Sequence, residues 1–246
     1  MERIYGRHAV LECLRAQRRK AYKLLVADGV RQSPTMNDIM TLAQQQRLRV
    51  ETVQRFTLDT ISEHNGGVAL EVEDYLYVTL DGILQTAAQR GEPPFILILD
   101  TLQDPQNFGN LIRTADAVGV HGIVIPERRS AAITPAVVSA SSGAVEHLPV
   151  ARVVNLARAV DTLKAADIWI SALQSDLRAK DIYQADLRGA LTLIVGNEGD
   201  GVSRLLRDKA DFLVQLPMRG HVESLNASVA GSVALYEAWR QRRQTA

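Results

Sequence analysis

The feature that most constrains the fold is a series of almost uninterrupted apolar segments in the second part of the chain. They read FILILD (95–100), GIVIP (122–126), WISAL (169–173), LTLIVG (191–196) and FLVQLP (212–217). A strand that is apolar at consecutive positions is buried on both faces, which is typical of a parallel sheet covered by helices. The sequence therefore predicts an α/β domain with a mostly parallel sheet.

The beginning of the chain predicts a second, smaller α/β unit. Predicted helices cover about 6–19 and 35–47, and the strand patterns YKLLVAD, RVETV and VALEVED alternate with them. Alternating strands and helices predict a parallel or mixed sheet. Residues 76–94 lack a strong core pattern and end in RGEPP, which cannot continue a helix. We therefore predict a domain at 1–75, a linker at 76–94 and a second domain at 95–246.

The composition is that of an ordinary soluble globular protein, with 46% hydrophobic and 23% charged residues and a formal net charge of zero. The apolar runs are shorter than a membrane span, and the charged start MERIYGRHAVLECLRAQRRK lacks the apolar core of a signal peptide. We expect a cytoplasmic protein without a membrane partner. The single cysteine, Cys13, excludes a disulfide framework and a cysteine-based zinc site, and no metal is expected.

A basic cluster lies near the start of the chain, with no acidic residue between Cys13 and Ala27. It consists of Arg15, Arg18, Arg19, Lys20 and Lys23. The cluster has two interpretations: a solvated helix end favoured by the helix dipole, or a surface that contacts the phosphates of RNA.

Polar segments follow three of the apolar strands. They are LQDPQNFGNLIRTA (102–115), VGNEGDGVS (195–203) and LPMRGHVESLNASVA (216–230). Each segment alone is explained by a helix cap or a turn. Ligands of open α/β sheets bind at the carboxyl ends of the strands, so the three together indicate a site. Asp100 and Asp104 brace this region by capping or by pairing with Arg113, and we do not expect them to bind a metal.

The same segments resemble the three motifs of the SpoU branch of the SPOUT RNA methyltransferases, also called the TrmH family. The pattern D-P-x-N-x-G-x-x-x-R-[ST]-A is met at 104–115, G-N-E-G-x-G at 196–201 and P-M-x-G-x-x-x-S-L-N at 217–226. IYGRHAVLECL (4–14) resembles the opening of the ribosomal-RNA guanosine 2′-O-methyltransferase subgroup, whose N-terminal domain is related to ribosomal protein L30e. His64-Asn65-Gly66 departs from the His-Gln-Gly of that subgroup, and we interpret HNGG as a turn.

The resemblance implies a deep trefoil knot in the second domain and S-adenosylmethionine as the cofactor. Family members hold the adenine largely by backbone groups, here near Gly196, Leu216 and Leu225, and Pro217 and Met218 would supply apolar walls. LDTLQDPQNFG is not the glycine-rich loop with which the usual rival fold binds this cofactor.

The resemblance also implies a set of catalytic residues: Asn107, Arg113, Glu198, Ser224 and Asn226. A guanidinium is a poor base because its pKa lies above about 12 and it has no acceptor site while charged. Arg113 is therefore expected to hold the substrate phosphate and stabilise the developing alkoxide. Asn107 would orient the ribose or brace Arg113, Glu198 would accept hydrogen bonds, and Ser224 and Asn226 would contact phosphate and ribose at the start of the last helix. The identity of the general base stays open.

These expectations predict an enzyme that methylates the ribose 2′-hydroxyl of a guanosine in 23S ribosomal RNA. Family members are homodimers, and a small-residue face on the predicted last helix (about 224–242) is compatible with close packing of another helix; it consists of Ala227, Ala230, Gly231 and Ala234. Two alternatives stay open: a transfer-RNA ribose methyltransferase of the same family, and a non-catalytic RNA-binding or ribosome-assembly protein.

Overall fold

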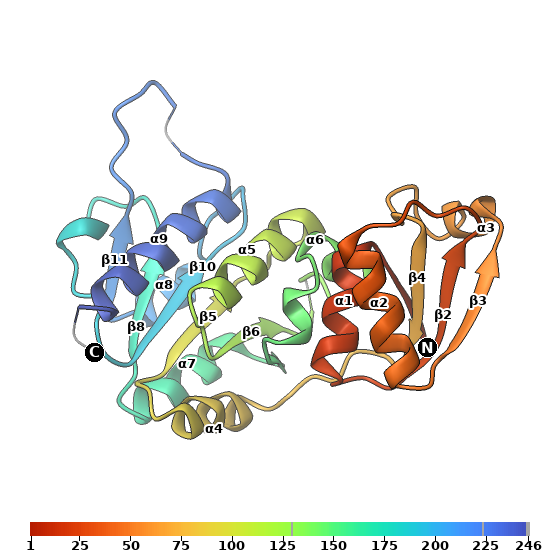
Figure 1. Cartoon of the computed structure of the whole chain (residues 1–246). Helices are drawn as coiled ribbons and strands as arrows, with labels where there is room; N and C mark the ends of the chain where they lie inside the picture. The colour runs from red at the N-terminus through yellow and green to blue at the C-terminus, as the bar shows by residue number, and fades with distance from the viewer. Residues whose placement is uncertain (129, 223, 245–246) are drawn as a thin grey trace. The chain divides into compact units, whose positions relative to one another are not determined.

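The computed structural model describes residues 1–128, 130–222 and 224–244. The chain divides into two compact units, each of which combines strands and helices (Figure 1). Unit 1 comprises Met1–Leu76 together with Ile133–His147, and unit 2 comprises Tyr77–Ala132 together with Leu148–Ala246. The second segment of unit 1 is therefore inserted, in sequence, between two segments of unit 2, which the sequence patterns do not predict.

Unit 1 is built on a mixed sheet, as the alternation of elements predicts. Its strands, in spatial order, are β1 (Glu2–Tyr5), β4 (Val68–Val72), β2 (Ala21–Ala27) and β3 (Arg49–Val53). β2 is parallel to β3 and antiparallel to β4. The helical elements are α1 (Arg7–Ala16), α2 (Pro34–Gln45), α3 (Arg55–Asp59), α6 (Pro135–Ala140) and η1 (Ala144–Glu146).

Two local features of unit 1 sharpen the sequence predictions. α1 ends at Ala16, earlier than expected, because Gln17 adopts a left-handed conformation with a φ of 51°. The HNGG segment is a turn, as predicted. Asn65 is fully buried, its Oδ1 accepts a hydrogen bond from the backbone N of Gly67 at 2.7 Å, and Gly66 and Gly67 have φ values of 63° and 83°.

Unit 2 contains an all-parallel sheet, which confirms the prediction from the apolar runs. Its strands, in spatial order, are β7 (Val150–Val153), β6 (Gly122–Pro126), β5 (Phe95–Leu99), β10 (Leu191–Val195), β8 (Trp169–Leu173), β11 (Phe212–Gln215) and β9 (Lys180–Asp181). The chain runs outward from β5 through β6 to β7 and then returns to the other side of β5. The order of the strands therefore reverses next to β5, where ligand sites of open sheets form.

Helices cover both faces of this sheet (Figure 1). One face packs into a buried apolar cluster with residues of α4 (Leu80–Arg90), α7 (Leu156–Ala165) and α8 (Arg204–Lys209). The other face carries α5 (Pro105–Ala117) and α9 (Ala227–Arg242), and the short helix η2 (Ile182–Gln184) also belongs to this unit. α5 and α9 approach each other closely at Gly231. A Cβ built on this glycine would lie only 2.5 Å from Leu111 Cδ2, so a larger residue would not fit there.

In unit 2, two further boundaries differ from the sequence predictions. The segment 76–94, predicted as a linker, contains α4, which buries Ile83 and Ala87 and ends at a left-handed Gly91 with a φ of 65°. The last helix begins at Ala227 rather than near Ser224, because Asn226 is its N-cap. Ser224 therefore lies in the loop before the helix.

Candidate active site

A cavity of about 660 Å³ lies where β8, β10 and β11 end and α9 begins. Its walls include Gln174 and Ser175 after β8, the loop after β10, and the segment after β11. The volume lies in the range of small-molecule sites, which is about 300–1,000 Å³. All the residues predicted to hold the cofactor line this cavity, namely Gly196, Leu216, Pro217, Met218 and Leu225.

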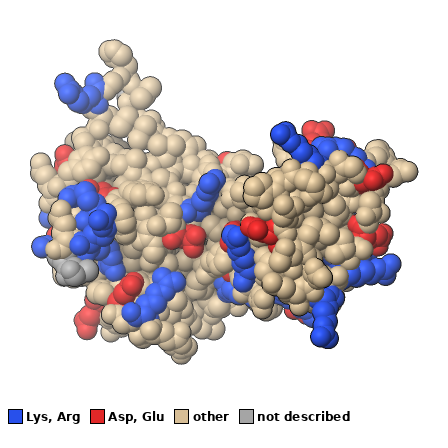
Figure 2. Space-filling view, in the orientation of Figure 1, with Lys and Arg blue, Asp and Glu red and all other residues tan. Residues whose placement is uncertain are grey.

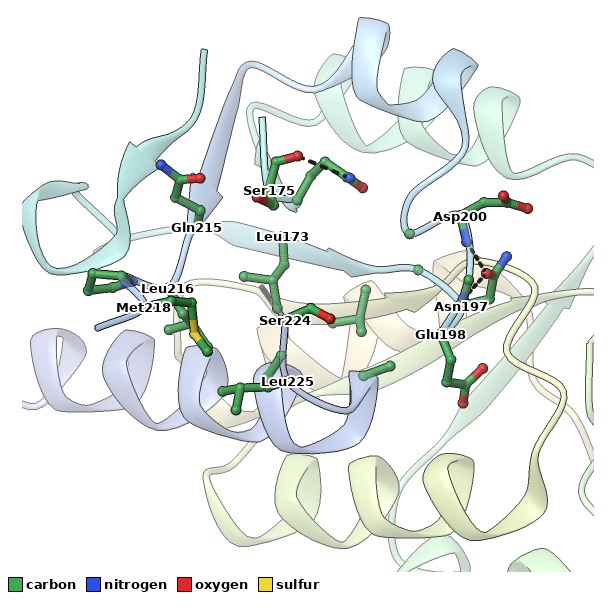
Figure 3. A pocket seen from close by; sticks show the side chains of 18 residues that line it. Leu173, Ser175, Asn197, Glu198, Asp200, Gln215, Leu216, Met218, Ser224 and Leu225 are labelled. Atoms are coloured by element: carbon green, nitrogen blue, oxygen red, sulfur yellow. Dashed lines mark hydrogen bonds between the residues drawn. The ribbon is translucent and has the colours of Figure 1, made fainter. Parts of the chain in front are cut away.

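The acidic side chains of the cavity lie at one end of it (Figure 3). Asn197, Glu198 and Asp200 gather there, whereas Leu216 and Met218 lie at the other end together with the amide of Gln215. Such a lining suits a ligand that combines charged groups with an apolar or aromatic part.

The loop after β10 is rigidly folded around Asn197. Asn197 Oδ1 accepts hydrogen bonds from the backbone N of Gly199 and of Asp200, at 2.9 and 2.8 Å. A Cβ built on Gly196 would lie 2.0 Å from the carbonyl carbon of Gly201, so the loop closes too tightly for any side chain at this position. The loop therefore closes tightly on itself at Gly196, and residues 196–201 line the cavity.

The end of β5 anchors this loop. Thr101 Oγ1 accepts a hydrogen bond from Asn197 Nδ2 at 3.1 Å, and Asp100 Oδ2 accepts one from the backbone N of Ser203 at 2.7 Å. Thr101 has a φ of 58°, which is strained for a β-branched residue. Asp100, with 3% of its surface exposed, thus braces the second motif segment. Asp104 caps α5 by accepting from the backbone N of Asn107 at 3.1 Å.

A chain of side-chain hydrogen bonds joins the three predicted motif segments. Asn107 Nδ2 donates to Glu198 Oε1, and Asn107 Oδ1 accepts from Ser228 Oγ at 3.0 Å. Ser228 Oγ also lies 2.7 Å from Asn226 Oδ1. The structure therefore brings together Asn107, Glu198 and Asn226, which the sequence places far apart.

The free helix N–H groups predicted at the start of α9 are partly occupied. Asn226 Oδ1 accepts from the backbone N of Ser228 at 2.9 Å and of Val229 at 3.3 Å. This is the ordinary N-cap arrangement. Asn226 thus satisfies two of the N–H groups at the start of the helix, and the contact of Ser224 and Asn226 with phosphate and ribose stays a prediction.

The remaining predicted catalytic residues lie around the cavity in different ways. Glu198 and Ser224 line it, whereas Asn107, Arg113 and Asn226 are not among the described residues that do. Arg113 lies on α5 with an exposed side chain. The residues predicted to be catalytic are thus divided between the cavity wall and the adjoining α5 and start of α9.

Two residues of this region were not identified from the sequence. Ser228 is 4% exposed, and the sequence patterns assign it no role. Gln174 follows β8 and its Oε1 accepts from the backbone N of Val202 at 2.9 Å. The polar Gln-Ser pair directly after WISAL is the signal that identifies this further strand end.

Arg19 of the basic cluster is buried, which corrects its prediction as an RNA contact. Its side chain is 1% exposed and pairs with Glu146, whose side chain is also 1% exposed, and with Glu2 Oε2 at 2.8 Å. Burial opposes the charged guanidinium, but hydrogen bonding and charge from Glu146 outweigh it and raise the pKa of Arg19. Burial, with Glu146 nearby, also raises the pKa of the Cys13 thiol to about 12.

The other basic residues of the cluster lie closer to the surface. Arg15 pairs with Glu12 and Asp38, and Lys23 pairs with Glu51 and Glu71. Arg18 lies over the ring of Tyr75, and the exposed Lys20 lies over the ring of Tyr22. In Figure 2 basic side chains form several separate groups with acidic side chains between them. On this face the positive charge is therefore divided into local groups.

The small-residue face of α9 packs inside unit 2. Gly231 contacts Leu111 of α5 and Val195 of β10, and Ala234 is fully buried. A different part of α9 carries Tyr236, which is 50% exposed and lies near Tyr183, which is 55% exposed. The half-buried ring of Trp239 packs edge to face against the ring of Tyr236, with the ring centroids 5.8 Å apart.

Within the described part of the chain, no helix is long and apolar enough to span a membrane. The same residues contain no group of three or more His, Cys, Asp or Glu side chains arranged to hold a metal ion.

Comparison with known protein families agrees with the two units. Residues 94–236 match the model of the SpoU rRNA methylase family. Residues 3–78 match the model of the RNA 2′-O ribose methyltransferase substrate-binding domain.

The chain is also similar to individual proteins over nearly its whole length. It is 43% identical over 240 residues to YacO of Bacillus subtilis, a protein assigned to the TrmH family of tRNA/rRNA methyltransferases, and the match covers 97% of this chain and 95% of YacO. The structure resembles the SpoU methyltransferase AviRb of Streptomyces viridochromogenes, with a TM-score of 0.81 and 26% identity over 99% of this chain and 90% of AviRb. The complex of AviRb with AdoMet matches with a TM-score of 0.80 and 25% identity, covering 99% and 91% of the two chains.

Proposed function

The chain belongs to the SpoU family of RNA methyltransferases, and from that premise we propose that it methylates the ribose 2′-hydroxyl of a guanosine in 23S ribosomal RNA with S-adenosylmethionine as the donor. The observation that carries the proposal is the hydrogen-bonded connection of Asn107, Glu198 and Asn226 beside the cavity. A helix cap or a turn at each strand end would not require these side chains to meet.

The cavity suits S-adenosylmethionine. Its volume of about 660 Å³ accommodates a molecule of this size, and Gly196 is among the residues that line it. Leu216 and Met218 supply apolar walls, and Glu198 with Asp200 places negative charge near a cationic ligand. When bound, the cofactor supplies an electrophilic methyl group on its sulfonium.

The protein's own task is then to orient and activate the ribose hydroxyl. Holding two reactants in line removes on the order of 7–11 kcal/mol of barrier in well-oriented cases. Asn107 contributes an amide fixed between Glu198 and Ser228, so it presents a constant geometry to the ribose. Ser224 lines the cavity and is assigned to substrate contact.

We assign Arg113 to stabilising the negative charge that develops on the ribose 2′-oxygen during methyl transfer. As an exposed guanidinium on α5, it suits a bidentate contact with a phosphate and stabilisation of the 2′-oxygen as its proton leaves. Proton acceptance is left to another group, because a guanidinium has no acceptor site while charged. The hydroxyl must lose its proton to some base during transfer.

Unit 1 is assigned to RNA recognition, because its sequence matches a substrate-binding domain of RNA 2′-O ribose methyltransferases. Arg15, Arg18, Lys20 and Lys23 are proposed to contact phosphates, and Arg19 is not. We assign 1–75 to the L30e-like domain, 76–94 to the connection and 95–246 to a knotted catalytic domain in a cytoplasmic enzyme. The L30e relationship and the trefoil knot are implied by family membership.

We propose that two copies of the chain associate through α9. Exposed apolar patches mark interaction sites, and the exposed Tyr183 and Tyr236 lie together with the half-buried Trp239. The small-residue face does not serve this purpose, since Gly231 and Ala234 pack within unit 2.

The experiment that tests the function is transfer of labelled methyl groups from S-adenosylmethionine to unmodified 23S ribosomal RNA and to unmodified transfer RNA. Nucleoside analysis then identifies the product. The proposal expects 2′-O-methylguanosine from ribosomal RNA and none from transfer RNA.

Other outcomes identify the alternatives. Label in transfer RNA would instead identify transfer RNA as the substrate, which is one of the two substrate classes in the "tRNA/rRNA" name of the relatives. Label as a base-methylated nucleoside would contradict ribose chemistry. Absence of both transfer and cofactor binding would favour a non-catalytic RNA-binding protein.

A further inference from the structure

Ser228 occupies an unusual position in the hydrogen-bonded connection of the site. It lies in the first turn of α9, is 4% exposed and faces two side-chain oxygens. Its Oγ is 3.0 Å from Asn107 Oδ1 and 2.7 Å from Asn226 Oδ1. Ser228 therefore joins the first and third motif segments at a buried point.

The chemistry of the partners fixes which end of each amide faces Ser228. Asn107 must direct its NH₂ group toward Glu198, because an ionised carboxylate can only accept. Its oxygen then points to Ser228. Asn226 must direct its oxygen toward α9, because it accepts from backbone N–H groups there.

A serine hydroxyl has one proton and here faces two acceptors, so it donates to one of them at a time. Asn226 Oδ1 keeps its backbone donors whichever way the hydroxyl points. For Asn107 Oδ1, the hydroxyl of Ser228 is the donor that the structure records. Loss of this hydroxyl therefore affects Asn107 more than Asn226.

We propose that Ser228 is a positioning residue for methyl transfer: its hydroxyl holds the amide of Asn107 in the one orientation that directs Nδ2 to Glu198 and so fixes the Glu198 carboxylate at the edge of the cavity. With the amide reversed, Asn107 Oδ1 would face the carboxylate without a proton between them, and Glu198 would be released. This inference rests on the proposed function, since it concerns the geometry of that reaction.

A matched control lies one turn further along the same helix. Ser232 Oγ is 2.8 Å from Thr114 Oγ1, so it also connects α9 to α5 through a serine hydroxyl. Ser228→Ala and Ser232→Ala each remove one such connection. Only the first removes a hydrogen bond to Asn107.

The test compares kcat, KM for RNA and the cofactor dissociation constant of the two variants. For Ser228→Ala we expect kcat to fall about tenfold to a hundredfold, the size of effect that small misplacements in active sites produce. Its cofactor affinity and its KM should stay within about threefold of wild type. Ser232→Ala should keep kcat within about threefold, and urea unfolding should show similar stabilities for both variants.

A double-mutant cycle provides the decisive readout. If Ser228 acts through Asn107, adding Ser228→Ala to Asn107→Ala should lower kcat by less than about threefold further, because coupled residues are not additive. An undiminished effect of Ser228→Ala in that background would overturn the proposal, and so would equal kcat values for the two serine variants. A wild-type protein that transfers no methyl group would instead contradict the proposed function itself and the positioning role with it.

Discussion

Two polar connections in this protein join residues that are far apart in the sequence, and they are built from different chemistry. In unit 1, Arg19 pairs with Glu146, 127 positions away, and the side chains of both are 1% exposed. In unit 2, Asn107 joins Glu198 and Ser228, which lie 91 and 121 positions away. There the connection consists of amide and hydroxyl groups, and Glu198 is exposed.

The difference indicates what each connection does. Two buried opposite charges stabilise one another only as a pair, and removing one leaves an uncompensated charge inside the fold. A hydrogen bond between neutral amide and hydroxyl groups contributes only about 0.5–1.5 kcal/mol to stability. The ion pair thus belongs to the architecture of unit 1, whereas the amide network determines geometry beside the cavity of unit 2.

The largest expected effect is on activity. Arg113→Ala should lower methyl transfer by at least about 10³-fold, because it removes the group assigned to the developing charge. The dissociation constant of S-adenosylmethionine, measured by calorimetry, should stay within about threefold of wild type. Loss of cofactor binding would show that Arg113 belongs to the cofactor site instead.

Breaking the buried ion pair of unit 1 is expected to affect stability. Glu146→Gln leaves Arg19 buried opposite a neutral group and should lower the free energy of unfolding by about 3 kcal/mol, measured in urea. Glu12→Gln, which weakens the more exposed pairs with Arg15 and His147, is the control and should cost less than about 1 kcal/mol. Equal losses for both variants would contradict a special role for the buried pair.

The loop after β10 allows a test of cofactor affinity. Asn197→Ala removes the acceptor for the backbone N of Gly199 and Asp200 and should weaken S-adenosylmethionine binding about tenfold, or about 1.4 kcal/mol. Asn155→Ala, which removes the N-cap of α7, is the matched control. An affinity that is unchanged in Asn197→Ala would separate this loop from the cofactor site.

The buried thiol of Cys13, near Arg19 and Glu146, predicts that the free energy of unfolding depends on pH. The pKa of Cys13 is about 12 in the folded protein, against an ordinary value of 9.0. The unfolded chain therefore releases this proton first, and the contribution to stability, complete below about pH 9, is lost as the pH rises toward 12. From pH 9 to 10 the free energy of unfolding should fall by ~1 kcal/mol more in wild type than in Cys13→Ala. Parallel pH profiles of the two proteins would contradict a buried, protonated thiol.

The smallest effect is expected at the surface of unit 1. Lys20→Ala should weaken RNA binding moderately and reduce the slope of log affinity against log salt by about one unit. Filter binding at several salt concentrations measures this slope. An unchanged slope would favour the interpretation of the basic cluster as a solvated helix end.

Much of unit 2 was predictable because its information is local. Continuous apolar runs identified β5, β6, β8, β10 and β11, and their all-parallel arrangement follows from burial on both faces. The motif spacing identified Asn107, Glu198 and Asn226, and the structure brings them together.

What escaped prediction depends on partners that are distant in sequence. Nothing near Arg19 indicates Glu146, so a buried residue looked like part of a basic surface. Ile133–His147 joins unit 1 although its neighbours in sequence belong to unit 2. Ser228 was not singled out from the sequence, because its contact with Asn107 arises only when α5 and α9 meet.

The central claim is that the strand-end loops of unit 2 form the binding site of S-adenosylmethionine. Calorimetric titration of the intact protein with S-adenosylmethionine tests it most directly, with Asn197→Ala measured alongside. We predict saturable binding of one molecule per chain and weaker binding by the variant. Absence of saturable heat in the wild-type protein would contradict the assignment of the cavity.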